Sequence, residues 1–204
     1  MRVEFYYDVV CPYAYLAHTQ LERACTPHGA TIDYRPILLG GLFRAVRGDD
    51  GPMPTMPESK KRMNLRDMAR WAEHWGVPLA MPEAHPRRTV LAMRAIVAAD
   101  DKPAATRALY EAYWKDGLDV ASGEVVAGVL ERAGLDGERL VRRATEPDVK
   151  DELLRRTDEA KLAGAFGVPT FVVHADGASE LYWGQDRIQF VEAHLARAER
   201  DDPS

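Results

Sequence analysis

The N-terminal stretch MRVEFYYDVVCPYAYL, residues 1–16, passes from a predicted strand into a predicted helix at a cysteine. Residues 3–7 are rich in β-branched and aromatic side chains, which is typical of a buried strand. A turn is expected over residues 8–11, and Pro12 suits the first turn of a helix, where its missing N–H costs nothing. We expect that helix to end near Pro27 and Gly29. Cys11 therefore lies at the junction between a predicted strand and a predicted helix.

The chain continues into a second strand and then into a long helical block. Residues 31–35 predict a strand that ends at Pro36, and the resulting β-α-β unit predicts a right-handed crossover in a parallel sheet. Glycines and prolines crowd residues 38–57 and predict a long irregular loop. Helical patterns bounded by Gly and Pro follow at 58–75, 89–99, 104–115, 123–133 and 148–162.

The end of the chain returns to strands. Residues 170–173 and 180–183 predict two strands around the turn 175–177, and a last helix is expected from Asp186 to about Arg200, leaving a short frayed acidic tail. With the helical block removed, the remaining order is that of thioredoxin. We therefore expect an α/β thioredoxin fold with a large all-helical insertion. Its thioredoxin-like domain comprises residues 1–40 and 163–204, and the insertion comprises residues 41–162.

Composition narrows the class of function. A net charge of −5 argues against general binding to nucleic acid or to anionic membranes, and 46% hydrophobic with 29% charged residues is ordinary for a globular chain. We find no signal-peptide pattern and no run of about 20 apolar residues, so we expect a cytoplasmic protein with reduced thiols. Two cysteines are too few for a zinc site or a disulfide framework, and no metal is expected.

Cys11 is the sharpest chemical feature of the sequence. The partial positive charge at a helix N-terminus and the free N–H groups of its first turn stabilise a thiolate, and thiols in such settings titrate at about 3.5–7.5. The alternative is a small buried residue at the start of a helix. If Cys25 lies on the same helix, the two cysteines are about 21 Å apart, so any thiol chemistry uses one cysteine.

Two further segments point to ligand contacts. Pro169 precedes a predicted strand, and the local sequence alone predicts a trans Val168–Pro169 peptide bond. In a chain with the thioredoxin order of elements, however, the proline at this position is usually cis and faces the active-site helix. The backbone of Val168 can then pair with a peptide-like ligand as a short added strand. In the segment 183–187, free N–H groups make a carboxylate site and Asp186 can accept from an ammonium group, although a simple N-cap is the alternative.

Five motifs in order carry a family resemblance. They are Phe5-Tyr6-Tyr7-Asp8 through Cys11-Pro12-Tyr13-Ala14-Tyr15-Leu16, then Arg35-Pro36 with Leu38-Leu39-Gly40-Gly41-Leu42-Phe43, then Lys60 and Asp67 to Trp71-Ala72, then Ala165-Phe166-Gly167-Val168-Pro169-Thr170-Phe171, and Trp183-Gly184-Gln185-Asp186-Arg187. The sequence resembles the 2-hydroxychromene-2-carboxylate isomerases, relatives of the kappa-class glutathione transferases in the DsbA-like branch of the thioredoxin superfamily.

The resemblance implies a set of roles. It implies glutathione, or another low-molecular-weight thiol, as cofactor, a small-molecule substrate and a homodimer. Cys11 stands where the family has a serine that hydrogen-bonds the glutathione sulfur. The cofactor-binding residues implied are Cys11, Lys60, Val168, Pro169, Gln185, Asp186 and Arg187. The substrate-binding residues implied are Phe43, Trp71 and, in the loop 82–86, His85 and Pro86. Met63 departs from the pattern because it stands where the family has a tyrosine.

Three hypotheses about function remain open at this point. The first is a glutathione-dependent cis–trans isomerase of an aromatic-pathway intermediate, in which a thiolate adds to a double bond, rotation follows and the thiolate leaves. The second is a monothiol oxidoreductase or transferase that uses Cys11 as its nucleophile. The third is a protein that binds a thiol or a partner without turnover. A Cys11→Ser variant separates the first two, because only the second needs the sulfur of Cys11.

Overall fold

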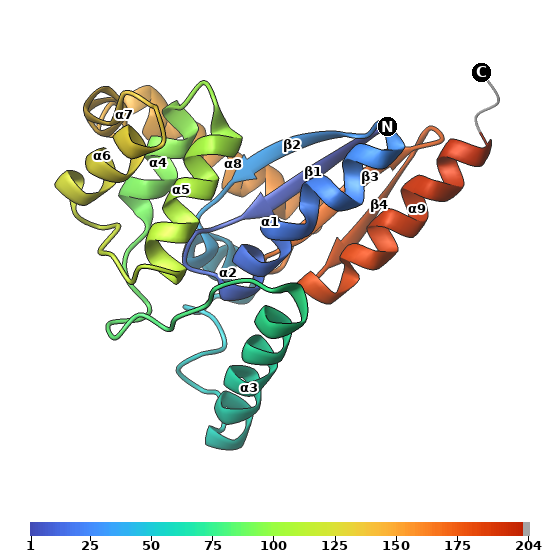
Figure 1. The fold of residues 1–204 in the computed structure, drawn as a ribbon, viewed down its shortest axis with the longest axis horizontal. Coiled ribbons are helices and arrows are strands. Elements are labelled where there is room, and N and C mark those ends of the chain that lie inside the picture. The colour runs from blue at the N-terminus through green and yellow to red at the C-terminus, as the bar shows by residue number, and fades with distance from the viewer. Residues whose placement is uncertain (202–204) are drawn as a thin grey trace.

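The computed structural model describes residues 1–201 and is centred on a four-stranded sheet in the order β2-β1-β3-β4 (Figure 1). The strands are β1 (Arg2–Tyr7), β2 (Thr31–Pro36), β3 (Thr170–Ala175) and β4 (Ala178–Trp183). β1 and β2 run parallel, while β1–β3 and β3–β4 are antiparallel. The predicted parallel pairing is thus correct for the first β-α-β unit alone, and the sheet as a whole is mixed.

Helices surround this sheet and form a block at one end of it. They are α1 (Pro12–Cys25), α2 (Leu39–Arg47), α3 (Glu58–Trp75), α4 (Val90–Ala98), α5 (Lys102–Trp114), α6 (Gly123–Arg132), α7 (Gly137–Arg143), α8 (Pro147–Leu162) and α9 (Ile188–Asp201), with 3₁₀ helices η1 (Thr26–His28) and η2 (Gln185–Arg187). Figure 1 shows α1 and α9 side by side over one face of the sheet, α4 to α7 gathered at its end, and α3 projecting from the body. α8 contacts β2 from the opposite face, where Glu159 pairs with Arg35 at 3.4 Å.

Three sequence predictions need correction. Residues 39–47, predicted as part of an irregular loop, form α2. The Asp8 carboxylate, which lies outside this segment, accepts from its first backbone N–H, that of Leu39, and so supports the first turn of the helix. α7 was not predicted; Asp136 caps it by accepting from the Arg139 backbone N–H at 3.0 Å. The last helix begins at Ile188 instead of Asp186, because residues 185–187 form the 3₁₀ turn η2.

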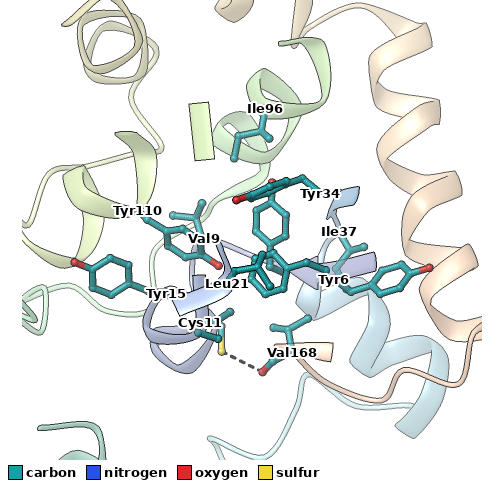
Figure 2. Packing of buried hydrophobic residues seen from close by; sticks show 14 of the residues in the cluster. Tyr6, Val9, Cys11, Tyr15, Leu21, Tyr34, Ile37, Ile96, Tyr110 and Val168 are labelled. Atoms are coloured by element: carbon teal, nitrogen blue, oxygen red, sulfur yellow. Dashed lines mark hydrogen bonds between the residues drawn. The ribbon is translucent and has the colours of Figure 1, made fainter. Parts of the chain in front are cut away.

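The core joins the sheet to the helical block. The ring of Phe5 stacks on Tyr7 and Phe171, with centroid separations of 4.8 and 5.5 Å. His18 of α1 lies between Phe5 and Tyr110 of α5, and Figure 2 shows residues of the sheet, α1, α4 and α5 in one cluster. Burial of aromatic side chains on this scale supplies much of the hydrophobic stabilisation of a domain.

The order of elements is that of a thioredoxin fold with helices inserted between β2 and β3. The division into a part made of residues 1–40 and 163–204 and a part made of residues 41–162 stays a prediction. Residues 202–204, where the acidic tail was expected to fray, lie outside the described residues. Within residues 1–201, no helix has the length and apolar character needed to cross a membrane.

Candidate active site

Cys11 is the residue immediately before α1, and its backbone is held from several sides. Its own N–H donates to the Asp8 carbonyl at 3.0 Å, and its carbonyl accepts from Tyr15 at 3.1 Å, which begins the helix. The Trp114 indole N–H donates to the Val9 carbonyl at 2.7 Å, so α5 braces the same turn. Pro12 occupies the first turn of α1, as its fixed φ favours. The turn therefore places the cysteine in one defined position.

The Cys11 side chain contacts the loop before β3. Its Sγ lies 3.3 Å from the Val168 carbonyl oxygen, to which the thiol donates, and Figure 2 shows this hydrogen bond as a dashed line. The Val168–Pro169 peptide bond is cis. Cys11 is only 7% exposed, and Val168 is equally buried. The structure thus brings together the two sequence features that were 157 residues apart.

The ionisation expected for Cys11 is wrong for the protein described here. Burial raises the pKa of the Cys11 thiol to about 12, and the nearby Asp8 adds to the rise. The backbone N–H groups of Ala14 and Tyr13 lower the pKa, as the position at a helix N-terminus predicts, but they do not outweigh the loss of solvation. The folded protein therefore holds Cys11 as a neutral thiol.

Asp8 was not singled out from the sequence, yet its carboxylate organises three elements. It accepts from the Leu39 backbone N–H at 2.9 Å, from the Thr89 hydroxyl at 2.7 Å and from the Val10 N–H at 3.2 Å. These bonds tie the turn before Cys11 to the first residues of α2 and α4. Burial raises the pKa of the Asp8 carboxyl while all three hydrogen bonds lower it. The sequence signal for a role of Asp8 in the site is its position three residues before Cys11.

Tyr13 is the second residue that sequence reasoning passed over. Burial raises its pKa to about 12, and the charges of Asp67, Cys11 and Asp186 each add to that rise. Asp67 lies on α3 and Asp186 in η2, and both of these elements contact α1. The only available signal was its position in the first turn of α1, two residues after the cysteine.

The turn from β4 to α9 lies beside the cis-proline loop. The Gly184 N–H donates to the Pro169 carbonyl at 3.0 Å, and Gly184 has a φ of 105°, which a side chain would strain. Gln185 is buried at 7% exposure, and Asp186 forms an ion pair with Arg187. Five of the predicted cofactor residues (Val168, Pro169, Gln185, Asp186 and Arg187) therefore lie on two adjoining turns.

The predicted substrate residues lie on several other elements. The ring of Phe43 on α2 covers Gly51, where a Cβ would approach it to 2.4 Å. Trp71 packs against Trp75 on α3, with centroids 4.7 Å apart. His85, which precedes a second cis proline at Pro86, has its Nδ1 2.9 Å from the Tyr113 hydroxyl. None of the four predicted substrate residues, Phe43, Trp71, His85 and Pro86, all of which the structure describes, hydrogen-bonds to Cys11.

Lys60 stands apart from the other predicted cofactor residues. It is exposed in the first turn of α3, where its N–H donates to the Pro57 carbonyl at 2.9 Å. No hydrogen bond or ion pair joins it to Cys11 within residues 1–201. In the same part of the chain, no group of three or more His, Cys, Asp or Glu side chains is arranged to hold a metal ion.

A thioredoxin fold with inserted helices and a cysteine facing a cis proline defines a thiol-site protein of the DsbA-like class. The chain belongs to the DsbA-like thioredoxin domain family, whose family model matches residues 2–196, and within it to the group of 2-hydroxychromene-2-carboxylate isomerases and kappa-class glutathione transferases. Members of that group are enzymes, and so is this protein.

Individual relatives match over nearly the whole chain. It is 28% identical to the 2-hydroxychromene-2-carboxylate isomerase of Sphingobium xenophagum over 194 residues, which cover 95% of this chain and 97% of the relative. It is 28% identical to glutathione S-transferase kappa 1 of Homo sapiens over 207 residues, covering 95% and 89%. A solved structure of a 2-hydroxychromene-2-carboxylate isomerase superimposes with a TM-score of 0.87 at 26% identity, covering 98% of this chain and 97% of the other.

Proposed function

We propose that this enzyme is a glutathione-dependent cis–trans isomerase of the 2-hydroxychromene-2-carboxylate type. The observation that carries the proposal is the contact between the Cys11 thiol and the Val168 carbonyl beside the cis proline. It places a sulfhydryl donor next to a backbone segment that can pair with an extended peptide-like ligand. The similarity to isomerases and kappa-class transferases along the whole chain supports glutathione as that ligand.

The residues of the two adjoining turns fit the functional groups of glutathione. Val168 offers an N–H and a carbonyl to the cysteinyl part, and Asp186 with Arg187 offers opposite charges to the γ-glutamyl amine and carboxylate. Gln185 adds an amide beside them. Bound glutathione would supply a thiolate that adds reversibly to a conjugated alkene, which frees rotation about the former double bond.

The chain's own residues then have limited tasks. Cys11 keeps its proton, because burial and Asp8 oppose a second anion in the site, and its S–H can donate to a neighbouring sulfur. Tyr13 also keeps its proton and can donate to charge that develops on the substrate. Phe43, Trp71, His85 and Pro86 are the proposed contacts of the aromatic substrate, and Lys60 is proposed to attract its carboxylate.

The test is an ultraviolet assay of 2-hydroxychromene-2-carboxylate isomerisation with and without glutathione. Wild type and the Cys11→Ser variant should both turn over substrate only when glutathione is present, because a hydroxyl can also donate to the glutathione sulfur. Cys25→Ser is the matched control, since Cys25 is also a free, buried cysteine but lies at the far end of α1, which begins directly after Cys11. Turnover without glutathione would contradict the proposal.

The alternative function is that of a monothiol oxidoreductase or transferase in which Cys11 is the nucleophile. The specific observation that favours it is that the residue facing the cis proline is a cysteine. Cys25 cannot resolve a disulfide with it, because the two cysteines lie at opposite ends of α1, about 21 Å apart. Loss of essentially all activity in Cys11→Ser, with Cys25→Ser unaffected, would select this alternative.

We also propose a cytoplasmic homodimer. Several large apolar side chains are exposed, with Leu162 85% exposed and Phe166, Trp183 and Phe190 nearly half exposed. Phe166 and Trp183 pack on each other with centroids 5.0 Å apart, forming a patch of the kind that a second copy covers. Sedimentation equilibrium should give twice the mass of 22.8 kDa. A monomer at micromolar concentration would contradict the dimer and leave the isomerase proposal untouched.

A further inference from the structure

The Val168 carbonyl is the acceptor around which the candidate site is arranged. The neighbouring Pro169 carbonyl already accepts from the Gly184 N–H at 3.0 Å, and proline has no N–H of its own. The Val168 carbonyl accepts from no backbone N–H of the described residues outside the helices and strands, so it is the backbone acceptor of this loop that an incoming amide can take. In the free enzyme, the Cys11 thiol donates to that same oxygen from 3.3 Å.

We propose that Cys11 and the bound ligand compete for the Val168 carbonyl, so that ligand binding releases the Cys11 S–H and turns it toward the ligand's sulfur. This inference rests on the proposed function, because it takes the ligand to be a peptide-like thiol such as glutathione. The ligand's amide N–H takes the carbonyl, and the displaced thiol is left with the ligand's sulfur as its new acceptor. No covalent bond forms or breaks in this exchange.

The exchange is favoured because the ligand's amide N–H is a stronger hydrogen-bond donor than the Cys11 S–H. An S–H is a weak donor and an amide N–H a strong one, so a ligand amide replaces the thiol at the carbonyl with a net gain. The displaced S–H cannot turn to water, since Cys11 is only 7% exposed. Asp8 opposes its ionisation from the side of the β1–α1 turn. Tyr13 and Tyr110, which also interact electrostatically with the sulfur, both stay protonated because their pKa values are raised. The proton therefore stays on Cys11, and the ligand's sulfur carries the negative charge.

Binding measurements on three proteins test the competition. The probes are glutathione and γ-glutamyl-alanyl-glycine, which keeps the amides but lacks the thiol. By calorimetry, the thiol-free peptide should bind Cys11→Ala about threefold more tightly than wild type, because no hydrogen bond must be displaced. It should bind Cys11→Ser about threefold more weakly than wild type, because a hydroxyl holds the carbonyl more firmly. Glutathione should show the opposite preference and bind Cys11→Ala most weakly.

A spectroscopic measurement follows the proton directly. In a Cys25→Ala background, Cys11 is the only source of an infrared S–H stretching band in the protein, and the band of free glutathione is removed by subtracting the spectrum of glutathione alone. The band should move to higher frequency when the thiol-free peptide binds, as the bond to the Val168 carbonyl is lost, and to lower frequency with glutathione, whose sulfur accepts more strongly. A peptide that binds without moving the band, or with equal affinity for all three proteins, overturns the competition alone. Failure of both peptides to bind overturns the use of glutathione as well.

Discussion

At the scale of single residues, Cys11 shows how burial can outweigh position. Its site at the start of α1 predicts a reactive thiolate, yet the thiol pKa is raised to about 12 because the side chain is shut off from water. In a Cys25→Ala background, we expect the rate of iodoacetamide alkylation to be slow at neutral pH and to climb about tenfold per pH unit toward pH 12, following the thiolate fraction. Urea-unfolded protein is the control and should show an ordinary thiol. A rate that levels off near pH 6 would contradict this account.

His18 gives a second residue-scale prediction. Its ring lies between Phe5 and Tyr110, and burial lowers the pKa from 6.5 to about 4, so it stays neutral in the folded protein. The unfolded chain binds a proton there below pH 6.5 while the folded chain does not, so stability falls as the pH drops from 6.5 toward 4.

His18→Phe keeps the stacking and removes this titration. Relative to His18→Phe, the wild type should lose about 3 kcal/mol of unfolding free energy between pH 7 and pH 4, measured by urea unfolding. Other acid-sensitive groups are present in both proteins and cancel in the difference. A difference between the two proteins that does not change with pH would show that His18 is accessible to protons in the folded state.

At the scale of elements, Asp8 connects the start of two helices to the turn before Cys11. Asp8→Ala leaves the Leu39 N–H and the Thr89 hydroxyl without their acceptor, and we expect a loss of about 3 kcal/mol in unfolding free energy. The Asp8→Asn variant keeps the shape and one acceptor oxygen, so it should lose less. Guanidinium unfolding measures both losses, and a change below 0.5 kcal/mol in Asp8→Ala, within the range of about ±0.5 kcal/mol usual for surface substitutions, would contradict the anchoring role.

The same carboxyl predicts a dependence on pH. Because burial raises the pKa of Asp8 in the folded state, the stability that it contributes is present below about pH 4, its unfolded pKa, and falls as the pH rises toward the folded pKa. The advantage of wild type over Asp8→Asn should therefore shrink as the pH increases from 4. An advantage that grows over that range would mean that the hydrogen bonds hold the folded pKa below the unfolded one.

The elements also show where sequence reasoning stops. The strand–turn–helix junction at Cys11 follows from a local pattern, because it depends on residues adjacent in the chain. The cis proline at Pro169 follows instead from the thioredoxin order of the elements, since the local sequence alone predicts a trans bond. The sequence predicts a loop where α2 forms, because Gly40 and Gly41 lower the local helix propensity, and what supports the first turn of α2 is the distant Asp8 carboxylate. The raised pKa of Cys11 likewise depends on packing that no short stretch of sequence encodes.

At the scale of the molecule, the order of elements was predictable and their mutual packing was not. The thioredoxin order was visible because β1, α1, β2, β3 and β4 each carry a strong local pattern. The sequence did not show that α5 reaches back to the turn before the cysteine, or that the helical block and the sheet share one hydrophobic cluster. A contact such as that between Trp114 and Val9 joins residues 105 positions apart and leaves no periodic signal.

This shared cluster predicts that the sheet and the inserted helices unfold together. Trp114 is fully buried, and its indole N–H donates to the Val9 carbonyl, so it links α5 to the turn that holds Cys11. Calorimetry should show a single transition for the wild type, and Trp114→Phe should lower the unfolding free energy by about 2 kcal/mol without splitting that transition, since it leaves a buried carbonyl unpaired. Tyr182→Phe, at a half-buried position on β4 outside this link, is the control and should have a smaller effect. Two separate transitions in the wild type would instead show that the insertion is an independent folding unit.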